Sequence, residues 1–60
     1  MLDHTDKAER YWKLMLEYHD LAEQAELPFL RDSYFKVATR YRLMAKEAFD
    51  LADAEKRHER

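Results

Sequence analysis

The chain has 60 residues, of which 47% are hydrophobic and 40% charged, with one proline, no glycine and no cysteine. This length holds one structural unit at most, residues 1–60, and without cysteine that unit has neither a disulfide framework nor a thiolate zinc site. The lack of glycine excludes phosphate-binding loops, and a net charge of −2 gives no general attraction to nucleic acid.

The first predicted helix covers residues 5–26, where helix formers carry apolar residues at helical spacing. Pro28 then interrupts the pattern, because proline inside a helix costs ~3 kcal/mol or more but is tolerated in the first turn. The second predicted helix covers residues 29–56, after a short turn at 26–29. The sequence therefore predicts an all-α fold, a two-helix antiparallel hairpin.

An internal repeat appears when the chain is aligned with itself at an offset of 23 residues. Two packed helices also share a ~3.5-residue rhythm without any repeat, and that explanation stays open. Under either explanation the helices present equivalent faces, which predicts a pseudo-two-fold axis in an antiparallel hairpin. The matching residues are Tyr11-Trp12-Lys13-Leu14 with Tyr34-Phe35-Lys36-Val37, Tyr18 with Tyr41, Leu21 with Met44, and Ala22 with Ala45.

Large aliphatic residues recur every seven positions along the second helix and predict the face that it buries. Beside them runs a column of alanines, Ala38, Ala45 and Ala52, and small residues in a column let helix axes approach closely. The predicted core between the two helices consists of Leu14, Leu21, Leu30, Val37, Met44 and Leu51.

The apolar arc of the first helix is wider than a single partner helix covers. It spans roughly 220°, whereas one partner needs only a ~100° stripe. We therefore expect self-association, with two hairpins forming a four-helix bundle as a homodimer, although a groove on another protein would cover the same arc. The residues predicted to lie at this interface are Tyr11, Trp12, Leu16, Tyr34, Phe35 and Phe49.

The charges of the two halves have opposite signs. Residues 5–26 hold six acids and three bases, a balance of −3, and residues 28–49 hold five bases and two acids, a balance of +3. Opposed helix faces of opposite sign favour one arrangement over its alternatives, although each exposed pair contributes under ~1 kcal/mol.

The most metal-like pattern is Glu55 with His58, because a Glu-x-x-His spacing puts both side chains on one helix face. In a hairpin the N-terminal segment returns alongside, so we expect Asp3 and His4 to lie near Glu55. The pattern occurs once and lies at the end of a helix, where fraying opposes a fixed set of ligands. We therefore expect no metal and no other cofactor.

The patterns for catalysis and for nucleic-acid binding are weak. Ser33 is the only serine and has no histidine near it in sequence, so we do not expect an enzyme. His19 is expected at the edge of the bundle. Five cations of the second helix resemble a nucleic-acid surface, but a solvated or intersubunit salt-bridge face explains them without a ligand. These cations are Arg31, Lys36, Arg40, Arg42 and Lys46.

Three segments follow one another in a recognisable order: Tyr18-His19-Asp20-Leu21-Ala22, then Pro28, then Tyr41-Arg42-Leu43-Met44-Ala45. In this order, over residues 11–52, the chain resembles short, uncharacterised bacterial helical-hairpin proteins. It departs from their pattern at Leu27, where such proteins typically have Asp as the cap of the second helix. The resemblance implies the hairpin fold and no known activity.

Together these patterns predict a non-enzymatic protein–protein interaction or scaffold module that self-associates through a wide apolar helix face. No apolar run approaches the ~18 residues of a membrane span and no signal-peptide pattern begins the chain, so we expect a cytoplasmic protein. The alternatives are a small accessory subunit docked on a larger protein complex and an RNA- or DNA-binding helical-hairpin regulator.

Overall fold

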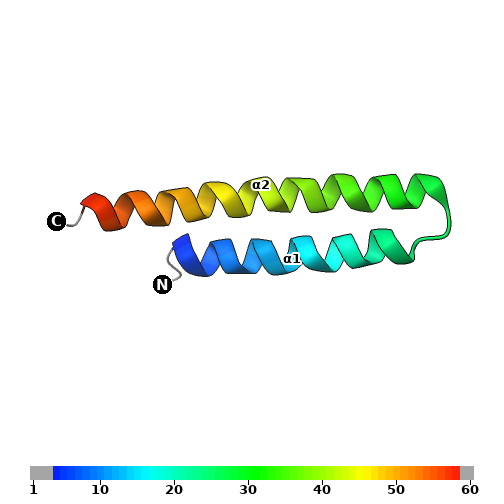
Figure 1. Cartoon of the computed structure of the whole chain (residues 1–60), viewed down its shortest axis with the longest axis horizontal. Helices are drawn as coiled ribbons and strands as arrows, with labels where there is room; N and C mark the ends of the chain where they lie inside the picture. Colours follow the sequence, from blue (N-terminus) through cyan, green and yellow to red (C-terminus); the bar gives the residue numbers. More distant parts are fainter. Residues whose placement is uncertain (1–3, 59–60) are drawn as a thin grey trace.

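Two helices account for the secondary structure of residues 4–58, the part of the chain that the computed structural model describes. Helix α1 covers His4–Gln24 and helix α2 covers Pro28–His58, and a three-residue connection places them antiparallel (Figure 1). The hairpin is long and thin, with extents of 51 × 16 × 13 Å. The predicted two-helix hairpin is therefore confirmed, with helix bounds within two residues of those expected.

The turn between the helices is held by backbone bonds and by one arginine. Pro28 begins α2, where its missing N–H costs no helical hydrogen bond. The amide of Ala25 donates to the carbonyl of Ala22 at 3.3 Å, and the guanidinium of Arg31 donates to the carbonyl of Ala25 at 3.2 Å. Since the last turn of α1 contains no basic residue, Arg31 supplies from α2 the cation that a helix C-terminus favours.

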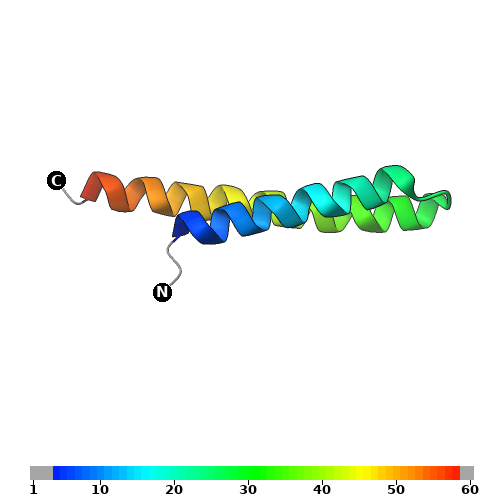
Figure 2. The ribbon, with the colours of Figure 1, turned by 90° about the horizontal axis from the view of Figure 1, so that it is seen from below.

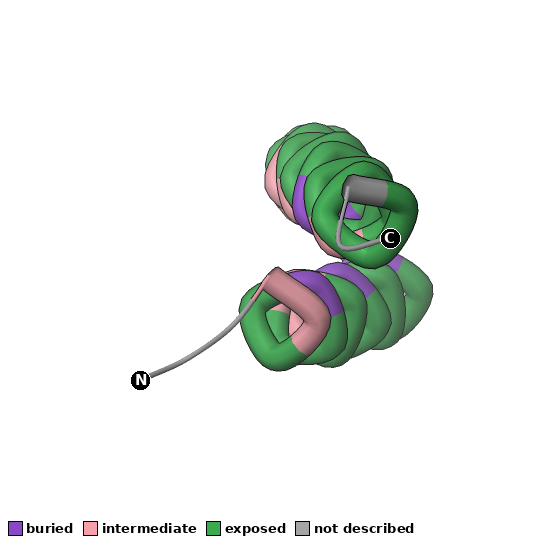
Figure 3. Tube along the Cα trace, turned by 90° about the vertical axis from the view of Figure 1, so that its left-hand side faces the viewer, coloured by how far each residue is buried: buried purple, intermediate pink, exposed green. Residues whose placement is uncertain are grey.

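The core between the helices is built from small residues. Figure 3 shows the buried positions as a strip along the line where the two helices face each other, and Figure 2 shows the shallow angle at which they cross. Within the described residues Met15 is the largest buried side chain, and the other five are alanines. The buried residues are Ala8, Met15 and Ala22 of α1 and Ala38, Ala45 and Ala48 of α2.

The predicted core of large aliphatic residues is wrong for three of its six members. Leu21, Met44 and Leu51 expose 43%, 39% and 52% of their surface in the hairpin. The other three, Leu14, Leu30 and Val37, are half-buried. Small side chains let two helix axes approach closely, and alanines together with Met15 occupy the line of closest approach. The larger residues are therefore displaced to the flank of this line.

Neither helix of the described part of the chain has the length and apolar character needed to cross a membrane.

Candidate interaction surfaces

Four tyrosines form a ladder that crosses between the helices. The ring centroids are 6.2 Å apart for Tyr34 and Tyr18, 5.7 Å for Tyr18 and Tyr41, and 6.3 Å for Tyr41 and Tyr11. All four residues are half-buried, so the rings pack on one another while part of each residue stays accessible to solvent. Ring pairs at such distances stabilise the packing by about 0.5–1.5 kcal/mol each beyond the area that they bury.

The ladder has the pseudo-two-fold symmetry that the sequence repeat predicts. Exchanging each tyrosine for its repeat partner turns the pair Tyr11–Tyr41 into the pair Tyr34–Tyr18, and their distances of 6.3 and 6.2 Å agree. The central pair Tyr18–Tyr41 is exchanged with itself, so the axis passes between these two rings. The offset of 23 residues therefore relates equivalent positions of the fold.

The tyrosines and the displaced aliphatic residues form one continuous surface, which we call the tyrosine face. Leu14 and Leu21 each follow a tyrosine of α1 by three positions, and Val37 and Met44 do the same on α2, so they share its side of the hairpin. A groove of ≈ 200 Å³ at one end of this face lies between Lys7 of α1 and Leu51 of α2. The members of the tyrosine face are Tyr11, Leu14, Tyr18, Leu21, Leu30, Tyr34, Val37, Tyr41, Met44 and Leu51.

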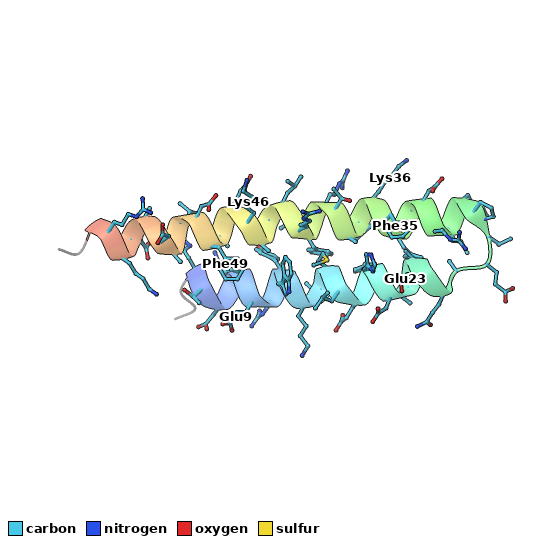
Figure 4. The ribbon with its side chains drawn as sticks, viewed as in Figure 1. Glu9, Glu23, Phe35, Lys36, Lys46 and Phe49 are labelled. Atoms are coloured by element: carbon cyan, nitrogen blue, oxygen red, sulfur yellow. The ribbon has the colours of Figure 1, made fainter. Side chains whose placement is uncertain are left out.

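The opposite side of the hairpin carries a second surface, which we call the aromatic face. Figure 4 shows Phe35 and Phe49 directed from α2 toward α1, whereas Lys36 and Lys46 point away from α1. The ring of His19 meets Phe35 edge-on, with centroids 5.4 Å apart. The members of the aromatic face are Trp12, Leu16, His19, Phe35, Arg42 and Phe49.

An open groove of ≈ 470 Å³ crosses the aromatic face. Trp12 and Phe49 form apolar walls, while Arg42, Lys46 and Asp50 bring charge to the same groove. Apolar and charged side chains therefore line the same groove on this face, whereas Lys7 and Glu47 are the charged residues that line the groove at the end of the tyrosine face.

The residues predicted to form a subunit interface fall on both sides of the hairpin. Four of them, Trp12, Leu16, Phe35 and Phe49, are 37–48% exposed and lie on the aromatic face. The other two, Tyr11 and Tyr34, are half-buried and lie on the tyrosine face. Residues that are adjacent in sequence, such as Tyr11 and Trp12, diverge by 100° around a helix, so the predicted set does not form one surface.

The N-terminus of α1 is tied to α2 by a histidine. The Nε2 atom of His4 lies 3.0 Å from a carboxylate oxygen of Glu55, which confirms the expected proximity of these two residues. Asp3, which was expected beside them, and the side chain of His58 lie outside the described residues. Glu55 thus has a partner across the hairpin, in a contact whose side chains are 32% and 62% exposed.

One group of side chains has the residue types of a metal site. Donor atoms of His19, Asp20 and Glu23 lie within 4.8 Å of one another, and His19 Nδ1 is 3.4 Å from a carboxylate oxygen of Glu23. All three residues are exposed and belong to successive turns of one helix, a common surface arrangement.

The hydroxyl of Ser33, the serine considered as a nucleophile, donates a hydrogen bond to the carbonyl of Phe29 at 2.9 Å, within its own helix.

No protein-family model, curated protein or solved structure matches this chain.

Proposed function

We propose that this protein is a non-enzymatic interaction module whose function is to self-associate, two hairpins forming a four-helix bundle. The observation that carries the proposal is the size of the buried side chains. Between the helices only alanines and Met15 are buried among the described residues, while ten large apolar residues are exposed by 37–66%. A hairpin that leaves most of its large apolar side chains in water gains little from folding alone.

The accessible surface supports the same proposal. The chain exposes 5290 Å², about 1,100 Å² more than the roughly 4,200 Å² of a compact monomer of this mass. A stable interface removes about 800 Å² from each partner, so the excess is of the size that one such interface covers. Closed two-fold symmetry is the commonest way for identical chains to cover such a surface.

The test is the mass of the native particle, measured by sedimentation equilibrium over a range of micromolar concentrations. We expect twice the chain mass of 7.4 kDa, with helical circular dichroism that falls together with the dimer on dilution. A folded particle of 7.4 kDa that keeps its helical signal at these concentrations contradicts the proposal.

A second function, an accessory subunit on a larger protein complex, is favoured by the aromatic face. Trp12 is 45% exposed and shares its groove with Phe49 and two cations, and buried tryptophan and arginine are typical anchors of hetero-complexes. The same mass measurement separates the two functions. The accessory subunit alone is expected to aggregate or to remain molten, without a stable dimer.

A further inference from the structure

The outer edges of the tyrosine face carry the same charged pattern on both helices. On α1 the pattern is Arg10, Leu14, Glu17 and Leu21, and on α2 it is Arg40, Met44, Glu47 and Leu51. The spacing of four, three and four positions places each set along one side of its helix. Leu14 and Met44 thus each lie between an arginine and a glutamate, and Leu21 and Leu51 each follow the glutamate.

None of the four charged residues forms an ion pair with another residue of the described part of the chain. Arg10, Glu17, Arg40 and Glu47 are all exposed. The ion pairs in the described part of the chain join His4 to Glu55, His19 to Glu23 and Asp53 to Arg57, and none of them uses these charges. The edges of the face are therefore available to an approaching molecule that carries the complementary pattern.

A second copy of this chain carries the complementary charges at matching positions along the helix axis. In the antiparallel hairpin, residues that contact each other across α1 and α2 have residue numbers with a sum between 52 and 59, and this sum defines the register of the two helices. If two hairpins are related by a two-fold axis parallel to the helices, α1 of one copy lies beside α2 of the other copy in this same register. Arg10 then lies opposite Glu47 of the partner subunit and Glu17 opposite Arg40 of the partner subunit, since both pairs add up to 57.

The pattern is also complementary in the other symmetric arrangement. In this arrangement the turns of the two hairpins lie at opposite ends of the dimer. Helix α1 then packs antiparallel to α1 of the other copy, and α2 packs antiparallel to α2 of the other copy. Arg10 then faces Glu17 of the partner subunit, and Arg40 faces Glu47 of the partner subunit. In both arrangements each arginine meets a glutamate at the edge of an apolar centre, which is the division into apolar core and polar rim found in stable interfaces.

We infer that the tyrosine face is the surface that a second copy of this chain covers, and that Arg10, Glu17, Arg40 and Glu47 form its charged rim. This inference rests on the proposed self-association and names the surface for it. Leu21, Met44 and Leu51, which are exposed in a single hairpin, become buried between the two hairpins of the dimer. The aromatic face, with charges inside its groove, remains outside the dimer.

Charge reversal on the rim tests the inference. The acidic variant Arg10→Glu with Arg40→Glu and the basic variant Glu17→Arg with Glu47→Arg each place like charges opposite one another in either arrangement. We expect each variant alone to self-associate about tenfold to hundredfold more weakly than the unmodified chain. An equimolar mixture of the two variants is expected to form a heterodimer with about the original affinity.

The matched control reverses the same amount of charge on the aromatic face, with Arg42→Glu and Lys46→Glu. Its dimer affinity is expected to stay within about threefold of the original, apart from a general charge effect that ~1 M salt removes. If a rim variant is unfolded alone, recovery of helical signal on mixing supports the inference equally. Persistent unfolding of the mixture, undiminished association of either rim variant, or an equal loss in the control overturns it. A monomeric unmodified chain instead refutes the proposed function itself.

Discussion

The two sides of the hairpin expose similar apolar residues but arrange them differently. On the tyrosine face Met44 is 39% exposed and stands in an uninterrupted column of aliphatic and tyrosine side chains. On the aromatic face Phe49 is 42% exposed, and Arg42 and Lys46 lie in the same groove. Individual exposure therefore does not distinguish the two faces. The distinction is where the charge lies: along the edges and in the groove at the end of the tyrosine face, but between Trp12 and Phe49 on the aromatic face.

This difference matters because of the energetic cost of burial. A charged side chain at the centre of an interface must leave water, whereas one at the rim stays hydrated and mainly steers association. The tyrosine face can be covered by a second copy without burying its arginines and glutamates. Covering the aromatic face would bury Arg42 or require a partner with a matching acid. The two faces are thus suited to different partners.

The largest expected difference between the faces comes from two adjacent residues. Tyr18 stacks on Tyr34 and Tyr41 at the pseudo-two-fold axis, so Tyr18→Ala is expected to lower the free energy of unfolding by about 2–4 kcal/mol. His19 makes one edge contact with Phe35, and His19→Ala is expected to cost under about 1 kcal/mol. Urea unfolding at equal chain concentration measures both values, and equal losses would remove the distinction between the faces.

Substitution of a buried alanine between the helices should have the next largest effect on stability. Ala45 is fully buried where the helices are closest, so Ala45→Leu is expected to cost about 1–3 kcal/mol through overpacking. The same change at the exposed residue Ala54 is expected to stay within about 0.5 kcal/mol. Thermal unfolding followed by circular dichroism compares the two. An Ala45→Leu variant as stable as the unmodified chain would show that position 45 accepts a large side chain between the helices.

The ion pair at the end of the tyrosine face should contribute less to the free energy of unfolding. His4 meets Glu55 across the hairpin at 3.0 Å, and a partly exposed ion pair contributes about 0.2–1 kcal/mol when the histidine is charged. His4→Ala is therefore expected to lower stability within that range. The control Arg57→Ala removes a pair within α2 alone, and it should affect stability less. A larger loss in the control would mean that the contact does not tie the helices together.

The smallest expected effect is that of metal ions. His19, Asp20 and Glu23 are exposed on one helix of the aromatic face, so ordering them around an ion would cost side-chain entropy. Addition of zinc or of a chelator is expected to move the melting temperature by no more than about 1 °C. A shift of several degrees that His19→Ala abolishes would instead make the aromatic face a metal site.

Part of this structure follows directly from the sequence. Helical periodicity on both sides of Pro28 predicts the hairpin, because a short connection forces antiparallel neighbours. The offset of 23 residues predicts the pseudo-two-fold axis, and the centroid distances of the two outer tyrosine pairs agree to within 0.1 Å, while their interplanar angles are 24° and 42°. These features depend on local spacing alone, and the sequence carries that spacing in full.

The assignment of residues to faces depends on how closely the helices approach. Hydrophobicity ranks Leu21 and Met44 above the alanines, so a sequence pattern favours them for the core. The structure buries Ala22 and Ala45 instead, one position further along each helix, because small side chains let the two helix axes approach closely there. The alanine column was visible in the sequence, and giving it priority would have placed the aliphatic column correctly on the flank.

The most direct test compares the self-association of two variants on the same helix, Met44→Glu and Phe49→Glu. Both introduce the same charge at sites of similar exposure, 39% and 42%, but on opposite faces of the hairpin. Sedimentation equilibrium is expected to show Met44→Glu dissociating at least about hundredfold more readily than the unmodified dimer, and Phe49→Glu within about threefold of it. If Phe49→Glu dissociates and Met44→Glu remains a dimer, the aromatic face is the interface and the tyrosine face is not.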